Sequence, residues 1–301
     1  MRLWVLVNTL LGFLLAVILY DAKPNTYLSK ENNKNFSQNS PKRIIVLSPA
    51  LLEIVFDAGF GKRVIAIPDF AIWPKKALNL PRIGGRFNPN KEAILALKPD
   101  LLIFQGNDIK IKEFAKINGI EVNDPGIKLD NLNDIFNAYT TIGILLKNPV
   151  KAEKRAFRLR IAFAELMEKS FKRKTRKRVL LLLGKRKGSF KGIYTATNKT
   201  FIGEILKKIG AINVFGKAMG LWPKISNEAI TAKNPECVLI LSPGIQLNQN
   251  EEQKEWEKFF PSIEAVKKKK IFVIKKDFIL IPGPRIIETA RIFEELVYGS
   301  N

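Results

Sequence analysis

Histidine is absent from this chain of 301 residues, and cysteine occurs once, as Cys237. Without histidine the chain cannot build Ser-His-Asp or Cys-His catalytic groups, zinc sites that use histidine, or a histidine ligand to haem. One cysteine excludes an internal disulfide, and its place in the apolar run CVLIL predicts a small buried side chain. Phosphate-binding glycine motifs and the hydrolase motif G-x-S-x-G are also missing. Enzymatic activity therefore has no support in the sequence, although carboxylates and lysines would be available for it.

Acidic residues are few relative to basic ones: 28 Asp and Glu stand against 51 Lys and Arg, which gives a net charge of +23. The densest basic stretches are residues 171–178, 185–187 and 267–270. Such charge suits a nucleic-acid or anionic envelope partner, or simply lysines on solvated faces. Since no aromatic residues are interleaved with these runs as a base-stacking surface requires, we expect solvated faces.

The amino terminus carries the one long hydrophobic run. Residues 3–20 are apolar apart from one Asn, one Thr and one Gly, which is close to the minimum length for spanning a bilayer. No clear A-x-A cleavage site or lipoprotein cysteine follows, so residues 1–20 fit either a signal peptide or an uncleaved membrane anchor. Either would direct the chain to the periplasm or the extracytoplasmic face of the inner membrane. Residues 21–42, rich in Asn, Ser, Lys and Pro, predict a polar linker.

From residue 43 onward, short apolar runs alternate with amphipathic stretches, a pattern typical of a parallel sheet covered by helices on both faces. This pattern predicts an α/β lobe over residues 43–128 and another over 178–301. Residues 129–177 contain no strand candidate and predict connecting helices, with a break near Asn148-Pro149. The predicted fold class is therefore α/β: two Rossmann-like lobes joined by a single long helix, with a ligand cleft between them. Because one helix is a stiff connector, we expect only modest closure on the ligand.

One phrase is written twice at a constant offset of 136 residues. NKEAILALKPDLLIF begins at Asn90 and SNEAITAKNPECVLI begins at Ser226, so that Glu92 aligns with Glu228. The repetition predicts a duplicated lobe in which both phrases fill the same helix-then-strand position. Asn90 and Ser226 suit the N-cap position, which would place each glutamate in a first helical turn. There the helix dipole alone stabilises a carboxylate by about 0.3–1 kcal/mol, so a purely structural role stays open.

Five stretches of the chain together resemble the substrate-binding proteins of ABC importers for metal chelates, namely vitamin B12, iron siderophores and haem. They are RIIVLSPALLEIVFDAGFGKRVIAI, LPRIGGRFNPNKEAILALKPDLLIF, TFIGEILKKIGAINVFG, SNEAITAKNPECVLIL and SIEAVKKKKIFVIKKDFILIPGPRIIETARIFEELV. The resemblance runs from Arg43 to the end, and PDFAIWP before LPRIGG is nearer to the vitamin B12 branch. It implies a binding protein without enzymatic activity or cofactor, whose ligand is itself a cobalt or iron chelate. It also implies that Glu92 and Glu228 dock onto the two subunits of a permease that carries its ATPase.

A flat macrocycle or chelate requires aromatic faces and a few polar or cationic groups. In open α/β sheets such groups lie beyond the carboxyl ends of the strands. The candidate ligand-binding residues in these loops are Ser48, Phe70, Trp73, Arg86, Phe87, Tyr194, Trp222 and Arg285. Packing as a loop anchor is the competing interpretation for each aromatic residue. For the arginines it is an ordinary solvated charge or, at Arg285, the start of a helix.

Two other functions compete with uptake of a metal chelate by a monomeric binding protein. The first is a basic envelope- or nucleic-acid-binding protein on the same fold without a transport role; the apolar segment 3–20 argues against nucleic acid. The second is an enzyme on the same bilobal scaffold, which would need cysteine or histidine ligands, and this chain has one cysteine and no histidine. We therefore expect no catalytic residue and no protein-held metal.

Overall fold

The structure is a computed structural model that describes residues 40–85, 88–171, 173–245 and 247–299. The predicted segment 1–20, most of the predicted linker 21–42, and the candidates Arg86 and Phe87 lie outside the described residues. Within the described ranges, no helix is both long enough and apolar enough to cross a bilayer. Residues Pro41–Asn301 form one compact unit by themselves.

The first half of this unit forms a sheet of four parallel strands in the order β2-β1-β5-β6. The strands are β1 (Ile44–Val46), β2 (Val64–Ala66), β5 (Leu101–Ile103) and β6 (Glu121–Val122). Its helices are α2 (Pro49–Asp57), α3 (Lys91–Ala96) and α4 (Ile109–Ile117). Alternate strand residues face α2 on one side and α3 with α4 on the other, so β1 and β5 are buried throughout. Short elements complete this half: η2 (Gly61–Arg63), η3 (Lys75–Ala77) and the hairpin strands β3 (Gly84–Gly85) and β4 (Asn88–Pro89).

The second half forms a sheet of five strands in the order β11-β10-β7-β8, with β9 also paired to β7. The strands are β7 (Arg178–Leu183), β8 (Tyr194–Thr195), β9 (Ile212–Asn213), β10 (Cys237–Leu241) and β11 (Ile271–Ile274). The pairings of β7 with β9 and β10, and of β10 with β11, are parallel, whereas β8 returns antiparallel to β7. Its helices are α7 (Phe201–Lys208), α8 (Asn227–Lys233), α9 (Gln249–Phe259), α10 (Glu264–Lys267) and α11 (Ile286–Tyr298).

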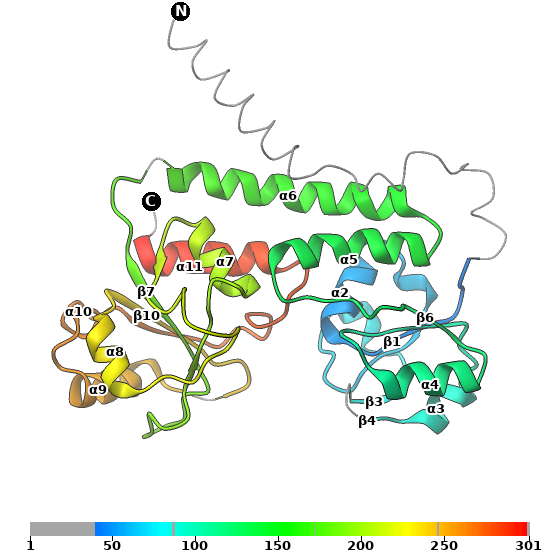
Figure 1. The fold of residues 1–301 in the computed structure, drawn as a ribbon, viewed down its shortest axis with the longest axis horizontal. Helices are drawn as coiled ribbons and strands as arrows, with labels where there is room; N and C mark the ends of the chain where they lie inside the picture. The colour runs from blue at the N-terminus through cyan, green and yellow to red at the C-terminus, as the bar shows by residue number, and fades with distance from the viewer. Residues whose placement is uncertain (1–39, 86–87, 172, 246, 300–301) are drawn as a thin grey trace, which may run out of the picture. The chain divides into compact units, whose positions relative to one another are not determined.

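Two antiparallel helices connect the sheets, α5 (Leu132–Leu145) and the longer α6 (Pro149–Phe171), where the sequence predicted a long helix preceded by a shorter one. The break falls at Pro149, which suits a first helical residue because proline lacks the N–H that has no partner there. Gly143 allows the helices to approach closely, since a Cβ at this position would lie 2.8 Å from the Cβ of Ala152. Figure 1 shows α5 and α11 along one side of α6.

The largest buried cluster is continuous across the unit. It contains Ile103 of the first sheet, Tyr139 of α5, Ala156 of α6 and Leu181 of the second sheet. The opposite face of each sheet has a separate cluster of its own. The connecting helices are therefore part of the core of both halves, and not a tether between independent ones.

Candidate functional site

The repeated phrase occupies the same place in both sheets. Helix α3 precedes β5 and α8 precedes β10, and the first strand residues, Leu101 and Cys237, keep the offset of 136 residues. Leu101 pairs with Ile44 of β1, and Cys237 pairs with Val179 of β7, both in parallel register. The two halves therefore share one local topology, as a duplicated lobe would.

The acidic residues late in the phrase, Asp100 and Glu236, form hydrogen bonds with backbone groups of a neighbouring segment. Asp100 accepts hydrogen bonds from the backbone N–H groups of Lys42 at 2.7 Å and Arg43 at 3.0 Å. Glu236 accepts one from the backbone N–H of Arg178 at 3.1 Å. Burial acts to raise the pKa of Glu236, but this N–H and the neighbouring cations lower it below its ordinary value. Each carboxylate thus fixes the start of the adjacent strand.

The glutamates early in the phrase, Glu92 and Glu228, are exposed in the first turns of α3 and α8. The side chain of Asn90 accepts the backbone N–H three residues on at 3.0 Å, and the hydroxyl of Ser226 does the same at 3.2 Å. The predicted N-caps are confirmed. The pKa of Glu228 is lowered, chiefly by a hydrogen bond with the Ser226 side chain and secondly by one from the backbone N–H of Glu228 itself.

An open hollow of about 590 Å³ lies beside Glu92, where α3 and α4 begin. It is lined by Asn88, Pro89, Asn90, Lys91, Glu92, Asp108, Lys110 and Ile111. Glu92 therefore borders an open hollow with a largely polar lining.

Ser48 and Gln105 follow the carboxyl ends of the adjacent strands β1 and β5. The buried Ser48 hydroxyl donates a hydrogen bond to the Gln105 side chain at 3.0 Å and caps α2 by accepting the N–H of Leu51 at 3.5 Å. Ser48 therefore lies at the carboxyl edge of the sheet, where the sequence predicted it. In the described arrangement, however, the Ser48 hydroxyl bonds within the protein.

Three candidate aromatic side chains are exposed. Phe70, after β2, is 78% exposed, and Tyr194 in β8 and Trp222 are 44% and 39% exposed. The segment that contains Trp222 runs beside β8: Thr195 donates its backbone N–H to Pro223 at 3.0 Å, and Tyr194 forms a bridge with Lys224. All three rings therefore have surface open to solvent.

Arg285, at the start of α11, joins the two halves. Its guanidinium forms two hydrogen bonds with the buried carboxylate of Glu53 on α2, at 3.0 Å and 2.5 Å, and lies 3.4 Å from Asp277. It also lies 5.0 Å from the ring centre of Trp73, so the structure brings these two predicted residues together. Burial raises the pKa of Glu53, and the ion pair with Arg285 partly opposes that effect. The positive charge of Arg285 is therefore already compensated within the protein.

A family model described as periplasmic binding protein matches residues 44–278. The chain belongs to the periplasmic binding protein family. The protein is therefore a solute-binding protein, not an enzyme. Its relatives include an uncharacterized ABC transporter substrate-binding lipoprotein of Bacillus subtilis, 25% identical over 91% of this chain and 86% of that protein. Another is a vitamin B12-binding protein of Photorhabdus laumondii, 28% identical over 83% of this chain and 86% of that protein.

Solved structures support the two-lobed fold of this periplasmic binding protein. A possible iron-binding periplasmic protein from Staphylococcus epidermidis is 24% identical, with a TM-score of 0.74 over 86% of this chain and 100% of that one. The vitamin B12-binding protein of Vibrio cholerae is 22% identical, with a TM-score of 0.69 over 86% of this chain and 97% of that one. A haem-binding protein from Roseiflexus is 21% identical, with a TM-score of 0.70 over 85% and 99%.

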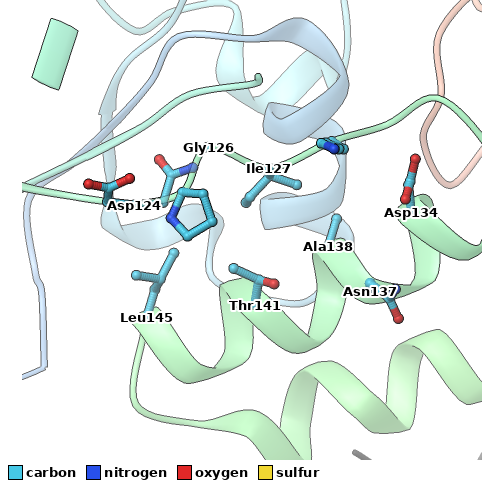
Figure 2. Close-up of a pocket in the computed structure, with 11 residues that line it drawn as sticks. Asp124, Gly126, Ile127, Asp134, Asn137, Ala138, Thr141 and Leu145 are labelled. Atoms are coloured by element: carbon cyan, nitrogen blue, oxygen red, sulfur yellow. The ribbon is translucent and has the colours of Figure 1, made fainter. Parts of the chain in front are cut away.

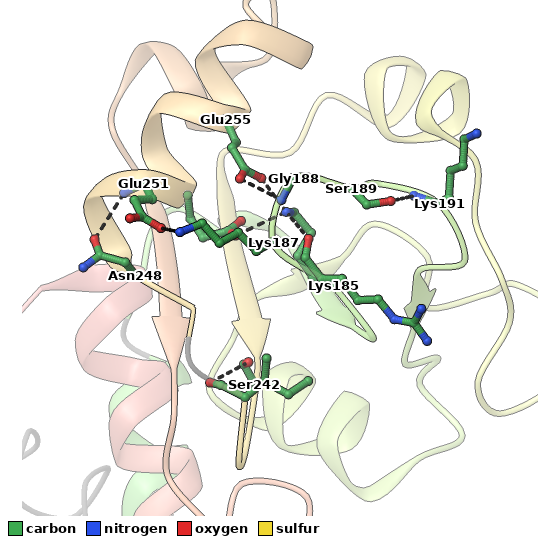
Figure 3. A network of polar contacts seen from close by, with 12 residues as sticks. Lys185, Lys187, Gly188, Ser189, Lys191, Ser242, Asn248, Glu251 and Glu255 are labelled. Atoms are coloured by element: carbon green, nitrogen blue, oxygen red, sulfur yellow. Dashed lines mark hydrogen bonds and ion pairs between the residues drawn. The ribbon is translucent and has the colours of Figure 1, made fainter.

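The basic run 185–187 of this binding protein is not the solvated face that the sequence predicted. Lys185 is buried, and its ammonium group lies 3.2 Å from Glu252 and 2.7 Å from Glu255 of α9 (Figure 3). Lys187 forms a solvated pair with Glu251 at 2.8 Å. Lys185 is enclosed because the turn after β7 is bonded to α9, where Glu255 accepts from both Lys185 and the backbone N–H of Gly188, and the carboxylates of α9 compensate the buried charge.

A second hollow of the binding protein, of about 290 Å³, lies between the loop 123–128 and helix α5 (Figure 2). It is lined by Asn123, Asp124, Pro125, Gly126, Ile127, Lys128, Asp134, Asn137, Ala138, Thr141 and Leu145. None of the candidate ligand residues that the structure describes lines it. Among the described residues, no group of three or more acidic or cysteine side chains is placed to hold a metal.

Two acidic partners of Arg285, Glu53 and Asp277, were not predicted from the sequence. Glu53 is the single charge within the apolar run LLEIVF, which forms α2 and is buried on most of its faces. A charge in such a position is normally paired, and that signal predicts a buried partner. It does not reveal which arginine the partner is, because Arg285 lies 232 residues away.

Proposed function

We propose that the protein captures a metal chelate outside the cytoplasm and delivers it to the permease dimer of an ABC importer with its ATPase. Cobalamin or another corrinoid is the favoured ligand, and an iron siderophore or haem is the next. In this proposal Glu92 and Glu228 dock onto the permease, one onto each subunit, and the binding protein acts as a monomer.

The observation that carries the docking role is the contrast within the repeated phrase. Asp100 and Glu236 occupy equivalent places and are used by hydrogen bonds that fix strands. Glu92 and Glu228 also occupy equivalent places and are exposed, but among the described residues neither carboxylate is bonded to a neighbouring strand. On a chain of net charge +23, two exposed anions at matching helix starts are well suited to cationic pockets on a partner.

Exposed rings support a flat, largely apolar ligand. Phe70, Tyr194 and Trp222 present aromatic surface at the carboxyl ends of the two sheets. Because Glu53 and Asp277 compensate Arg285, that side chain offers little net charge to an anionic siderophore. This favours a corrinoid, as do relatives named vitamin B12-binding proteins.

Location outside the cytoplasm is supported by the apolar segment 3–20 and by the family match. The relative from Bacillus subtilis is named a lipoprotein, which would also be held at a membrane. We assign the segment 1–20 as the signal or anchor that brings the chain there.

Titration of residues 41–301 with cobalamin, haem and ferric siderophores, followed by tryptophan fluorescence, tests the ligand. We expect one of them to bind with a Kd below about 10 μM. The variant with both Glu92→Ala and Glu228→Ala should bind that ligand equally well but fail to support uptake by the reconstituted importer. Failure of all three ligands would overturn the chelate assignment, and loss of ligand affinity in the double variant would overturn the docking role.

A further inference from the structure

The loop that follows β2 presents two apolar side chains to the solvent. Phe70 is 78% exposed and Ile72 is 54% exposed, whereas Ala71 between them is buried. The loop leaves the carboxyl end of its strand, which is where ligands of open α/β sheets bind. An exposed side chain takes its position chiefly from its backbone, so the place of Phe70 depends on what holds this loop.

The backbone of the loop forms a hydrogen-bonded turn that is attached to β3. Ala71 donates its backbone N–H to the carbonyl of Pro68 at 3.0 Å, which closes a turn with Phe70 as its third residue. Asp69 donates its backbone N–H to the carbonyl of Gly84 at 3.0 Å, and its carboxylate accepts the Gly84 N–H at 3.1 Å. The turn is therefore fixed to the hairpin beside it.

Arg82 binds three carbonyls of the same turn. One nitrogen of its guanidinium donates to Pro68 at 3.2 Å and also to Asp69, and the other donates to Ala71 at 3.2 Å. Carbonyl oxygens that point into one space repel each other, and a planar guanidinium with several donors can bind them together. Because these carbonyls lie on both sides of Phe70 in the chain, Arg82 fixes the backbone that carries this ring.

We propose that Arg82 is a positioning residue for ligand capture, which holds the turn 68–71 so that Phe70 is in place before the ligand arrives. This inference rests on the proposed function, since Phe70 is there a ligand contact. A loop that is ordered in advance loses little freedom on binding, and the affinity is not reduced by a population of misplaced loops. Trp73, later in the loop, lies 5.0 Å from Arg285, so the second half of the molecule holds the other end.

Arg63 provides a matched control at the opposite end of β2. Its guanidinium also donates to backbone carbonyls, to Pro41 at 3.2 Å and to Leu146 at 2.9 Å. Arg63 directly precedes β2, whereas the turn 68–71 follows this strand. Arg63→Gln therefore removes the same charge and the same kind of interaction at a distance from the turn.

Hydrogen exchange measures the effect of Arg82 without any ligand. Residues 41–301 suit this test because they hold all three buried clusters and every described strand pairing. Arg82→Gln should speed the exchange of the Asp69 and Ala71 amides at least about tenfold, because both N–H groups are bonded only while the turn is formed. Arg63→Gln should leave them as protected as in the parent protein. Unchanged protection in Arg82→Gln, or equal losses in both variants, would overturn the proposal.

A double-mutant cycle shows whether Arg82 acts through Phe70. With whichever of cobalamin, haem and ferric siderophore binds the parent protein, Arg82→Gln should weaken the affinity about tenfold, and Arg63→Gln should leave it unchanged. In a Phe70→Ala background, Arg82→Gln should cause little further loss. The same loss in both backgrounds would show that Arg82 binds the ligand itself and would overturn the positioning role. If none of the three ligands binds, the proposed function fails, whereas the exchange rates still decide whether Arg82 holds the turn.

Discussion

The carboxylates of this protein differ in whether other parts of the fold bind them. Glu53 and Glu236 are largely enclosed and bind groups of this chain, whereas Glu92 and Glu228 stand in the solvent. The positions of Glu92 and Glu228 in first helical turns, and their N-caps, were predicted from the sequence, because an N-cap is a local pattern within four residues. The sequence could not predict Glu53 with Arg285, since only the tertiary fold brings them together.

The free energy of unfolding depends on pH through the ionisation of Glu236. Its pKa is lowered in the fold, so the stabilisation is complete above its ordinary value of 4.5 and is lost as the pH falls through the lowered value. We expect Glu236→Gln to reduce the free energy of unfolding by about 1–2 kcal/mol at neutral pH, because a charged hydrogen bond is lost. In urea denaturation curves the deficit should shrink as the pH falls below 4.5, and it should disappear once the native carboxylate is protonated as well.

Glu264→Gln is the matched control for this prediction. Glu264 also pairs with a lysine, Lys268 at 2.8 Å, but the pair is solvated and lies within one helical turn. Its substitution should therefore change stability little at any pH. A deficit in Glu236→Gln that is as large at low pH as at neutral pH would contradict the assignment.

At the scale of elements, strands buried on both faces were predicted well, whereas the two-residue strands β8 and β9 were not. β1, β5, β7 and β10 come from continuous apolar runs whose composition alone indicates them. β8 and β9 have two residues each and exist because β7 offers them backbone partners. No periodicity can be read in two residues, so these strands depend on their tertiary neighbours.

The loop between β7 and β8 is held on α9 by Lys185. Lys185→Met would leave the Glu252 carboxylate buried without its cation, so we expect a loss of about 3–5 kcal/mol in the free energy of unfolding. Hydrogen exchange should become faster in α9 and in the loop 184–193. Lys187→Met, two residues away in the same basic run, removes only a solvated pair and should have little effect. Equal effects of the two substitutions would contradict the role of Lys185 in holding this loop on α9.

At the scale of the molecule, the two α/β halves were evident from the alternating pattern, but their shared core was not. The sequence predicted one stiff connector between two lobes. In the structure, α5 and α6 contribute to one buried cluster that contains strands of both sheets. A connector that is also core cannot be recognised from its own periodicity, because its apolar stripe does not reveal which partner it covers.

The continuous core predicts a single cooperative unfolding transition for residues 41–301. Separate lobes on a tether would unfold independently, whereas here exposure of one half removes the cover from the other. Calorimetry should give one peak whose calorimetric and van't Hoff enthalpies agree. Two resolved peaks, or far-UV and tryptophan signals with different midpoints, would show that the halves are energetically independent.

The tight turn between α5 and α6 determines how the two fragments would behave if a protease cleaved the chain there. The carbonyl of Leu146 in this turn accepts a hydrogen bond from Arg63 at 2.9 Å, and the helices on either side are packed together through Gly143. A protease that cleaves after Lys147 would separate the polypeptide into two pieces that still complete each other's interior. The pieces would behave as subunits of a heterodimer, and each half expressed alone would be expected to seek the other.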